Sequence, residues 1–290
     1  MREEAESIPT ILYHYTSIES FKKMLESRTI RATRYDQMND WSEVQLGVKL
    51  LLRAIKARKV DDSIQQYKDF LISGVEGYTE EPLEVYVLSL SAAADSLGQW
   101  RAYAARGGVA IGFDMQVVRN GFLRDITGSI GGVQVSDPVR PDPGNRLMRC
   151  EYTDKNGNLD LTAIVERRFF KSDSFPAFRS SGQSLGNKSF WPPLSVMIYR
   201  TICSIKHGAY KYEQEWRCIN IRPRPEDYPV KLSENNRLYI EMQFAPEEFI
   251  KEVWISPHGD ADGYERAVAH LRQENGLSFR IKRSTIPFRG

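Results

Sequence analysis

Cysteine is scarce in this chain of 290 residues, and its three cysteines follow no recognisable pattern. Cys150, Cys203 and Cys218 lie far apart without paired spacing, which argues against a disulfide framework and against a zinc knuckle. The chain also lacks an apolar N-terminal region of the signal-peptide type, and no apolar run reaches the roughly 18 residues of a membrane span. We therefore expect a cytoplasmic protein with no membrane partner.

A surplus of one charge is lacking as well, because 40 basic residues face 38 acidic ones and leave a net charge of +2. Such a balance neither demands nor excludes a nucleic-acid partner, since a local patch can lie within a neutral total. The dinucleotide motif G-x-G-x-x-G and the Walker loop are also missing. The glycines of segment 107–113 are instead expected to allow close packing of the backbone.

Strand-like and helix-like segments are mixed along the chain, which predicts one α+β domain over residues 1–290. Helical insertions are expected at about 43–75 and 160–205, and a loop or inserted hairpin is expected at 127–146. Other helices are predicted from Thr16 to about 28, after Asp95 or Ser96, and at 262–274. The predicted strands cover residues 11–15, 29–33, 85–91, 107–113, 147–152, 210–221, 237–244, 250–256 and 277–282.

The segment 210–221 is the strand around which the others are expected to be arranged. Because alternate side chains of a strand share a face, one face would carry two acids between two bases, namely Lys211, Glu213, Glu215 and Arg217. The opposite face would carry Tyr212, Trp216 and Cys218. One interpretation is a structural strand face with alternating charges, and the other is a pair of functional carboxylates held at fixed geometry.

His14 ends the first predicted strand, directly before the helix that is expected to start at Thr16. It is either a hydrogen-bonded residue that fixes the strand end or part of a site. The acidic turn at 36–43 matches no calcium loop and is interpreted as turn and cap residues.

Several separated motifs occur in one order along roughly residues 11–256. They are Leu12-Tyr-His-Tyr-Thr-Ser17, Asn39-Asp40 with Glu43, Leu88-Ser-Leu-Ser91, Trp100 with Tyr103, Gly108-Val-Ala-Ile-Gly-Phe-Asp114, and Lys206 followed by Tyr212-Glu-Gln-Glu-Trp-Arg217. This ordered set resembles a bacterial family of uncharacterised proteins, numbered two-nine-seven-one in the domain-of-unknown-function series.

More remotely, the layout resembles the ADP-ribosyltransferase fold. The residues that carry this resemblance are His14-Tyr15-Thr16, Ser89-Leu-Ser91 and Glu213-Gln-Glu215, in that order. The resemblance implies a split antiparallel β core with helical insertions. The chain departs from that pattern because it has no evident tyrosine-rich second motif and its helical insertions are long.

The second resemblance implies that NAD is a substrate and that no metal is needed. Glu215 would hold the ribose and Glu213 would orient the acceptor, while His14 would donate to a ribose hydroxyl. A carboxylate beside the ribose can stabilise the cationic transition state that forms when nicotinamide leaves. The NAD-binding residues would be His14, Tyr15, Thr16, Ser89, Ser91 and Tyr35, with Tyr15 or Tyr35 stacking on the ring.

On this interpretation the protein is an ADP-ribosyltransferase or an NAD glycohydrolase, for example a toxin or a phage-defence effector. His14, Ser91 and Glu215 are then expected to converge on one cleft. The acceptor is left open among protein, nucleic acid, small molecule and water.

Two alternatives remain open at this point. The same fold could serve as a non-catalytic module that senses a nucleotide or binds a protein. A metal-dependent nuclease would need Asp40, Glu43, Glu213 and Lys206 to gather a divalent ion. The chain has no Asp…Glu-x-Lys run, because Arg217 stands two residues after Glu215.

Overall fold

The computed structural model describes residues 9–38, 42–77, 84–116, 129–130, 133–134, 147–171, 191–222 and 229–287. Asp40 and most of the expected loop at 127–146 lie outside these residues.

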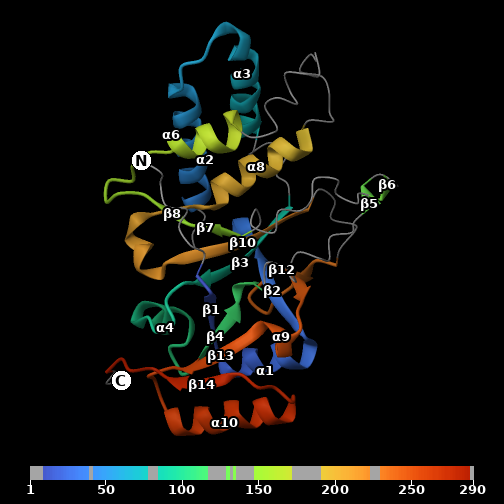
Figure 1. Ribbon diagram of the computed structural model, residues 1–290, viewed down its shortest axis with the longest axis vertical. Coiled ribbons are helices and arrows are strands. Elements are labelled where there is room, and N and C mark those ends of the chain that lie inside the picture. Colours follow the sequence, from blue (N-terminus) through green and yellow to red (C-terminus); the bar gives the residue numbers. More distant parts are fainter. Residues whose placement is uncertain are drawn as a thin grey trace.

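A ten-stranded sheet forms the centre of the molecule (Figure 1). Along its main path the strands follow the order β11-β12-β2-β3-β1-β4-β13-β14, and β10 pairs with both β3 and β7. All of these pairs are antiparallel except β13 with β14. The strands are β1 (Ile11–Thr16), β2 (Thr29–Arg34), β3 (Glu84–Ser91), β4 (Val109–Asp114), β7 (Leu147–Arg149), β10 (Glu215–Arg222), β11 (Lys231–Leu232), β12 (Leu238–Gln243), β13 (Ile250–Ile255) and β14 (Arg280–Arg283). Two further pairs are β5 (Ser129–Ile130) with β6 (Val133–Gln134), and β8 (Glu151–Tyr152) with β9 (Ile205–Lys206).

Strand β3 has two different neighbours on one of its edges. Its other edge pairs with β10 along the full strand. On the first edge, β2 pairs at Val87 and Tyr86, whereas β1 pairs at Ser91. Strands β1 and β2 therefore diverge along β3 and leave a gap beside residues 88–90.

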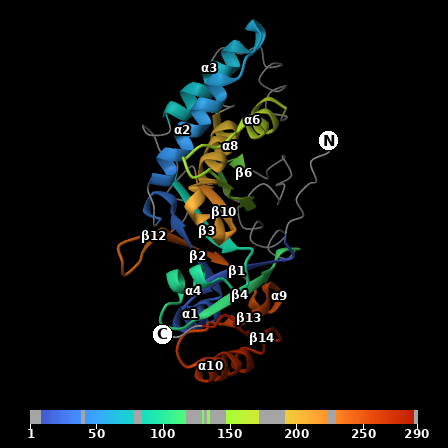
Figure 2. The same cartoon turned by 90° about the vertical axis from the view of Figure 1, so that its left-hand side faces the viewer.

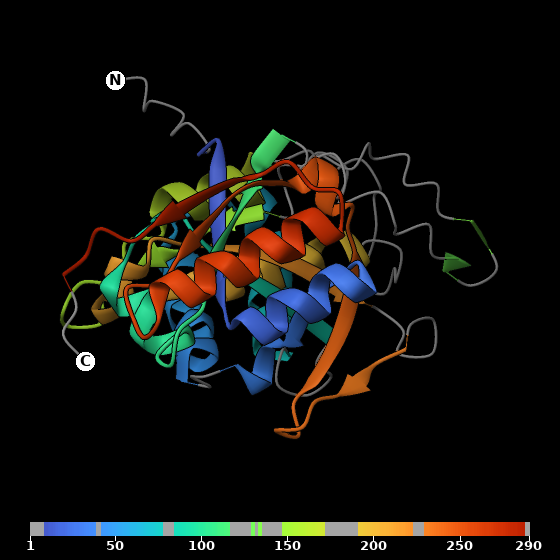
Figure 3. The same ribbon diagram turned by 90° about the horizontal axis from the view of Figure 1, so that it is seen from below.

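Helices cover the sheet at both ends of the long axis of the molecule (Figures 1 and 2). At one end lie α2, α3, α6 and α8, and at the other α1 and α10 lie side by side (Figure 3). The helices are α1 (Ile18–Ser27), η1 (Tyr35–Gln37), α2 (Ser42–Ala57), α3 (Asp62–Glu76), α4 (Leu97–Tyr103), α6 (Thr162–Val165), η4 (Glu166–Phe170), α8 (Trp191–Cys203), η5 (Gly208–Glu213), α9 (Pro246–Phe249) and α10 (Ala261–Glu274).

Each helical layer has its own hydrophobic core. One core joins Phe21 of α1 and Val268 of α10 to the sheet. A second core joins Leu51 of α2 and Ile202 of α8 to residues such as Ile219 of β10. The expected α+β class, with a mostly antiparallel sheet, is confirmed, and helices lie within both expected insertions.

The expectation of one strand over residues 210–221 is wrong in its first part. Residues Gly208–Glu213 form the 3₁₀ helix η5, whose first turn is capped by the ring of His207, which accepts from the amide of Ala209. Gln214 then adopts a left-handed conformation, with φ of 46°, and the strand begins at Glu215. Lys211 and Glu213 therefore do not lie on the strand face of Glu215 and Arg217, and Tyr212 does not lie on the opposite face. Trp216 and Cys218 do share the opposite face and belong to a hydrophobic core.

Smaller differences concern element ends. The segment 147–152 forms two strands in separate sheets instead of one. The helix expected to reach residue 205 ends at Cys203, because the chain continues into β9. Helix α1 is capped by Ser17 instead of Thr16, since the Ser17 hydroxyl accepts from the amide of Ser20.

The glycine at position 108 is required by close packing, as the sequence analysis expected. A Cβ atom there would lie 2.3 Å from the carbonyl oxygen of Thr16, which belongs to the backbone of the neighbouring strand.

We predict that Gly108→Ala lowers the free energy of unfolding by about 1–3 kcal/mol, because β1 and β4 must separate. Gly77→Ala is the matched control, since nothing lies within 4 Å of the added atom. Equal urea midpoints for the two variants would contradict the prediction.

Candidate functional site

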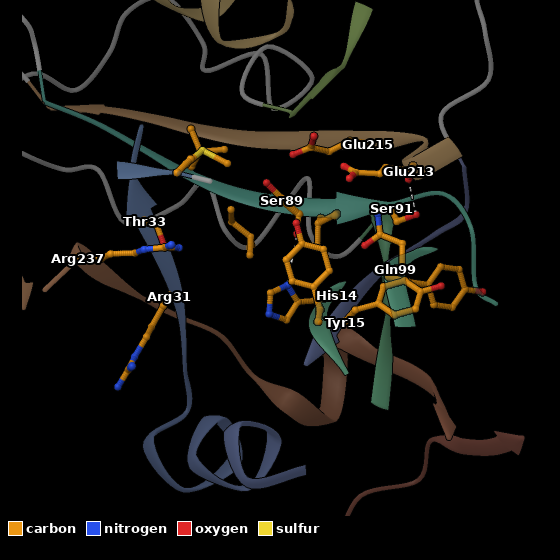
Figure 4. A pocket seen from close by; sticks show the side chains of 16 residues that line it. His14, Tyr15, Arg31, Thr33, Ser89, Ser91, Gln99, Glu213, Glu215 and Arg237 are labelled. Atoms are coloured by element: carbon orange, nitrogen blue, oxygen red, sulfur yellow. Dashed lines mark hydrogen bonds between the residues drawn. The ribbon is translucent and has the colours of Figure 1, made fainter. Parts of the chain in front are cut away.

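A pocket lies along the edge of β3, where β1 and β2 diverge (Figure 4). It takes lining residues from the four strands β1, β2, β3 and β10, from α4, from η5, and from the segments after η1 and before β12. They are Tyr13, His14, Tyr15, Arg31, Thr33, Met38, Val87, Leu88, Ser89, Leu90, Ser91, Gln99, Tyr103, Glu213, Glu215 and Arg237. Residues 87–91 of β3 all line it, beside the gap between β1 and β2.

Most of the predicted site residues meet in this pocket. His14, Tyr15, Ser89, Ser91, Glu213 and Glu215 line it. His14, Ser91 and Glu215 thus line one pocket, but the expected convergence is met only in part, because the side chains of His14 and Glu215 lie on opposite faces of the sheet. Thr16 and Tyr35 do not line it. Thr16 pairs with Val109 of β4, and the buried Tyr35 packs among the helices with its hydroxyl directed at the carbonyl of Ile202.

His14 enters the pocket from a different face of the sheet than Glu215. Tyr13 is paired with Ser91, and Ser91 with Glu215, so these three side chains share a face and His14, next to Tyr13, points to the other. The two groups reach one pocket only because it opens through the gap between β1 and β2. This geometry does not favour contact of a single small group, such as one ribose, with both side chains.

The ring of His14 is neutral and oriented. Its Nδ1 donates to the carbonyl oxygen of Ser89 at 3.3 Å, across the gap. Burial lowers the pKa of His14 from its usual 6.5, and the hydrogen bond to Ser89 opposes this change. A neutral imidazole that donates through Nδ1 has an acceptor at Nε2. His14 thus offers an acceptor to a ligand, whereas a donor was expected from the sequence.

Tyr15 is held in place by the protein itself. Its ring packs edge-on against Trp100 with centroids 4.7 Å apart. Its hydroxyl donates to the carbonyl of Ala93 at 2.7 Å and accepts from the amide of Ser96 at 3.1 Å. These contacts fix α4 against β1, and they do not favour the expected stacking of the Tyr15 ring on nicotinamide.

Behind the pocket acids lies a buried ion cluster, formed by Glu43, Lys206, Glu213, Glu215 and Arg217. Arg217 is fully buried, and its guanidinium donates to Glu215 at 2.9 Å and to Glu43 at 2.7 Å. A third donor of the same group reaches the carbonyl of Cys203 at 2.7 Å. The cluster therefore joins helix α2, the end of α8 and the central sheet.

The two acids of the predicted pair differ in their surroundings. Burial raises the pKa of Glu215, but the charges of Arg217 and Lys206 together outweigh burial and lower it to about 2. Both oxygens of Glu215 are engaged by these cations. Its charge thus serves the cluster, and this geometry does not favour Glu215 as the residue that holds a ribose.

Glu213 is the more available acid. Its Oε2 accepts from Lys206 at 2.7 Å, and its backbone carbonyl accepts from Ser91 at 2.7 Å. In the part of the chain that the structure describes, no hydrogen-bond partner of Oε1 is found. Burial raises the pKa of Glu213, and the attraction of Lys206 offsets this only in part. Glu213 is therefore the carboxyl group of the pocket that can interact with a ligand.

Several pocket residues were not singled out by the sequence analysis. Arg31 and Thr33 alternate in the strand predicted at 29–33, so their common side was a usable signal. Arg237 and the largely buried Gln99 gave no such signal, because their place in the pocket depends on how β12 and α4 pack. In Figure 4, Arg31 and Arg237 lie at one end, and Glu213 and Gln99 lie at the other.

The described residues contain no group of three or more His, Cys, Asp or Glu side chains arranged to hold a metal ion. The ammonium of Lys206 lies among the carboxylates of Glu43, Glu213 and Glu215, where the nuclease alternative would need a divalent ion. Asp40, the fourth residue of that alternative, lies outside the described residues. None of the described helices combines the length and the apolar character of a membrane span.

Part of the chain matches a known family. Residues 99–218 match the family described as "Protein of unknown function (DUF2971)". This match confirms the resemblance to that family. The matched DUF2971 segment contains Gln99, Tyr103, Lys206, Glu213, Glu215 and Arg217, and so includes the acidic end of the pocket and most of the ion cluster. No curated protein and no solved structure matches the chain.

We predict that Glu215→Gln lowers the free energy of unfolding by roughly 3–5 kcal/mol, because the buried charge of Arg217 loses a partner. Urea unfolding measures the change. Glu19→Gln, which breaks the exposed pair with Lys23, is the control and should leave stability unchanged within error.

Acid unfolding provides a second readout of the same variant. The folded pKa of Glu215 lies below its usual 4.5, so its contribution is present above that pH and is lost as the pH falls toward 2. Glu215→Gln should therefore flatten the loss of stability in this range. An unchanged slope and an unchanged urea midpoint would contradict a structural role for Glu215.

Proposed function

We propose that the pocket binds a nucleotide with opposite charges at its two ends, and that this ligand is NAD. The observation that carries the proposal is the separation of charge along the pocket. Arg31 and Arg237 line one end, and Glu213 lines the other. Guanidinium groups bind phosphates with two parallel hydrogen bonds. The oxidised form of NAD has a diphosphate and a cationic nicotinamide ring, which would meet the arginines and Glu213 respectively.

The charge of the ion cluster supports this orientation. Within the described residues, the three carboxylates of Glu43, Glu213 and Glu215 face two cations, Lys206 and Arg217. When all are ionised, one negative charge remains in excess. Because Glu213 is the member that lines the pocket with an oxygen to spare, that excess charge would act on a ligand there.

Neutral polar groups between the ends suit hydroxyl and amide groups. His14 offers an acceptor at Nε2, and Gln99 offers both a donor and an acceptor. The gap between β1 and β2 is also the feature that a split antiparallel core of the ADP-ribosyltransferase type would have. That finer assignment of the fold is part of this proposal.

A second candidate is cleavage of NAD, as an ADP-ribosyltransferase or an NAD glycohydrolase of a toxin or a phage-defence system. The observation that favours it is the Glu213 carboxylate at the edge of the pocket. The bond between C1′ and the nicotinamide nitrogen would break, with the electron pair leaving on nicotinamide. An acceptor or water would then bond to C1′ and lose a proton. Glu213, in place of Glu215, would stabilise the cationic ribose.

Binding is tested by calorimetric titration with the oxidised and reduced forms of NAD. We predict that the oxidised form binds more tightly, because only its nicotinamide ring is cationic. Arg31→Ala should weaken binding roughly tenfold, the typical loss of one hydrogen bond to a charged group. Arg266→Ala, on the exposed side of α10, is the matched control. No binding of either form by the folded protein would refute the proposal.

Turnover separates the two candidates. Purified protein is incubated with NAD labelled on the adenosine part, and nicotinamide release and transfer of label to cell lysate are followed. If the protein cleaves NAD, Glu213→Gln should reduce release at least 100-fold, the usual loss when a transition-state charge loses its partner. Binding without nicotinamide release would leave the non-catalytic nucleotide-binding module as the function.

A further inference from the structure

Lys206 lies at the centre of the buried ion cluster. Its ammonium is 2.6 Å from Glu215, 2.7 Å from Glu213 and 3.6 Å from Glu43. Its side chain is only 8% exposed, and the ring of Tyr210 lies on it at 5.0 Å. Strand β9, which carries Lys206, is fixed by its parallel pairing with β8. The ammonium is thus held in one place by the fold.

The three carboxylates depend on Lys206 to different degrees. Glu215 and Glu43 are also bound by Arg217. Glu213 has Lys206 as its single cationic partner in the described part of the chain. Loss of Lys206 would therefore leave Glu215 and Glu43 paired but would leave Glu213 buried without a counter-ion.

We infer that Lys206 is a positioning residue for the pocket: as the counter-ion of Glu213 it favours the charged carboxylate and holds one of its oxygens, which leaves the other for the ligand. This inference rests on the proposed function, because it names the group that makes Glu213 able to attract the cationic end of NAD. Lys206 itself does not line the pocket. Its effect on a ligand would pass through Glu213.

The groups around Glu213 explain why one cation matters so much. Helix α2 brings the carboxylate of Glu43, and β10 brings Glu215 together with Arg217. Tyr212 of η5 interacts with Glu213, whereas Tyr152 of β8 and Tyr210 of η5 lie beside Lys206. Burial raises the pKa of Glu213, Lys206 lowers it, and Glu215 and Glu43 raise it again. Without Lys206, all the strong effects favour the protonated form.

Protonation would change the chemistry of the pocket. A protonated Glu213 carries no charge and becomes a hydrogen-bond donor, so it no longer attracts a cationic ring. Once Lys206 is lost, the cluster keeps one negative charge in excess, because Glu43 and Glu215 face Arg217 alone, but Glu213, the member with an oxygen toward the pocket, carries none of it. A ligand with a cationic end would then bind weakly at neutral pH and more tightly as the pH rises above the pKa of Glu213.

The direct test needs no ligand. The carboxyl carbons of glutamate are labelled with ¹³C and titrated by NMR, and the Glu213 signal is identified by its loss in Glu213→Gln. We predict that Lys206→Met raises the pKa of Glu213 by roughly one to three pH units, the effect of removing an adjacent opposite charge. Lys206→Arg, which keeps the charge, should leave it near the wild-type value. An unchanged pKa in Lys206→Met would overturn the inference.

A second variant, Glu43→Gln, tests the same inference if Lys206→Met does not fold. Glu43→Gln removes a competing carboxylate while Lys206 stays in place. The pKa of Glu213 should then fall, which is the opposite direction. A pKa that does not fall in this variant would also count against the role of Lys206 as the shared counter-ion.

Calorimetric titration with oxidised NAD over a range of pH connects the residue to the ligand. Lys206→Met should bind about tenfold more weakly than wild type at neutral pH, with affinity recovering as the pH is raised. A uniform loss at every pH would indicate a merely structural effect and overturn the positioning role. If wild type binds no NAD while the NMR shift is found, the proposed ligand is wrong and the control of Glu213 by Lys206 stands.

Discussion

The buried guanidinium of Arg217 is the interaction on which the arrangement of the molecule depends. It joins the first turn of α2, the end of α8 and the central strand β10 through charged and main-chain partners. Removal of such a group from water is costly, and its attraction to neighbouring carboxylates offsets the cost only when the geometry is well satisfied. Two hydrophobic cores lie on either side of the sheet, and this cluster fixes how the helical layer meets it.

The pocket depends on the strand pairing and on the ion cluster together. Strands β1 and β2 share one edge of β3 but pair with different parts of it, and the divergence leaves room for a site reached from both faces. The acids of the ion cluster lie at one end of the pocket and make that end negatively charged. Arg31 of β2 and Arg237, before β12, lie at the other end. Polarity along the pocket is thus a product of topology and of the buried charges together.

Periodicity alone was enough to find most elements, because apolar alternation and helical stripes report directly on burial. It failed at residues 210–213, since a 3₁₀ helix with alternating tyrosines imitates a strand until the left-handed Gln214 is known. The order of the motifs predicted that His14, Ser91 and Glu215 would line one pocket, and all three line it. The sequence could not reveal that Lys206 forms an ion pair with Glu215. Lys206 lies on β9, and the pairing of β9 with β8 brings it to Glu215.

The gap beside β3 also affects how the site can change during evolution. The main-chain carbonyl of Ser89 points into the gap, where it accepts a hydrogen bond from His14. The amide of a strand residue points to the same side as its carbonyl, so both polar groups of this residue face the pocket. Backbone groups are present whatever the side chain is. Part of the recognition surface is therefore independent of residue identity, and divergent relatives could keep a similar ligand while sharing few of the side chains around it.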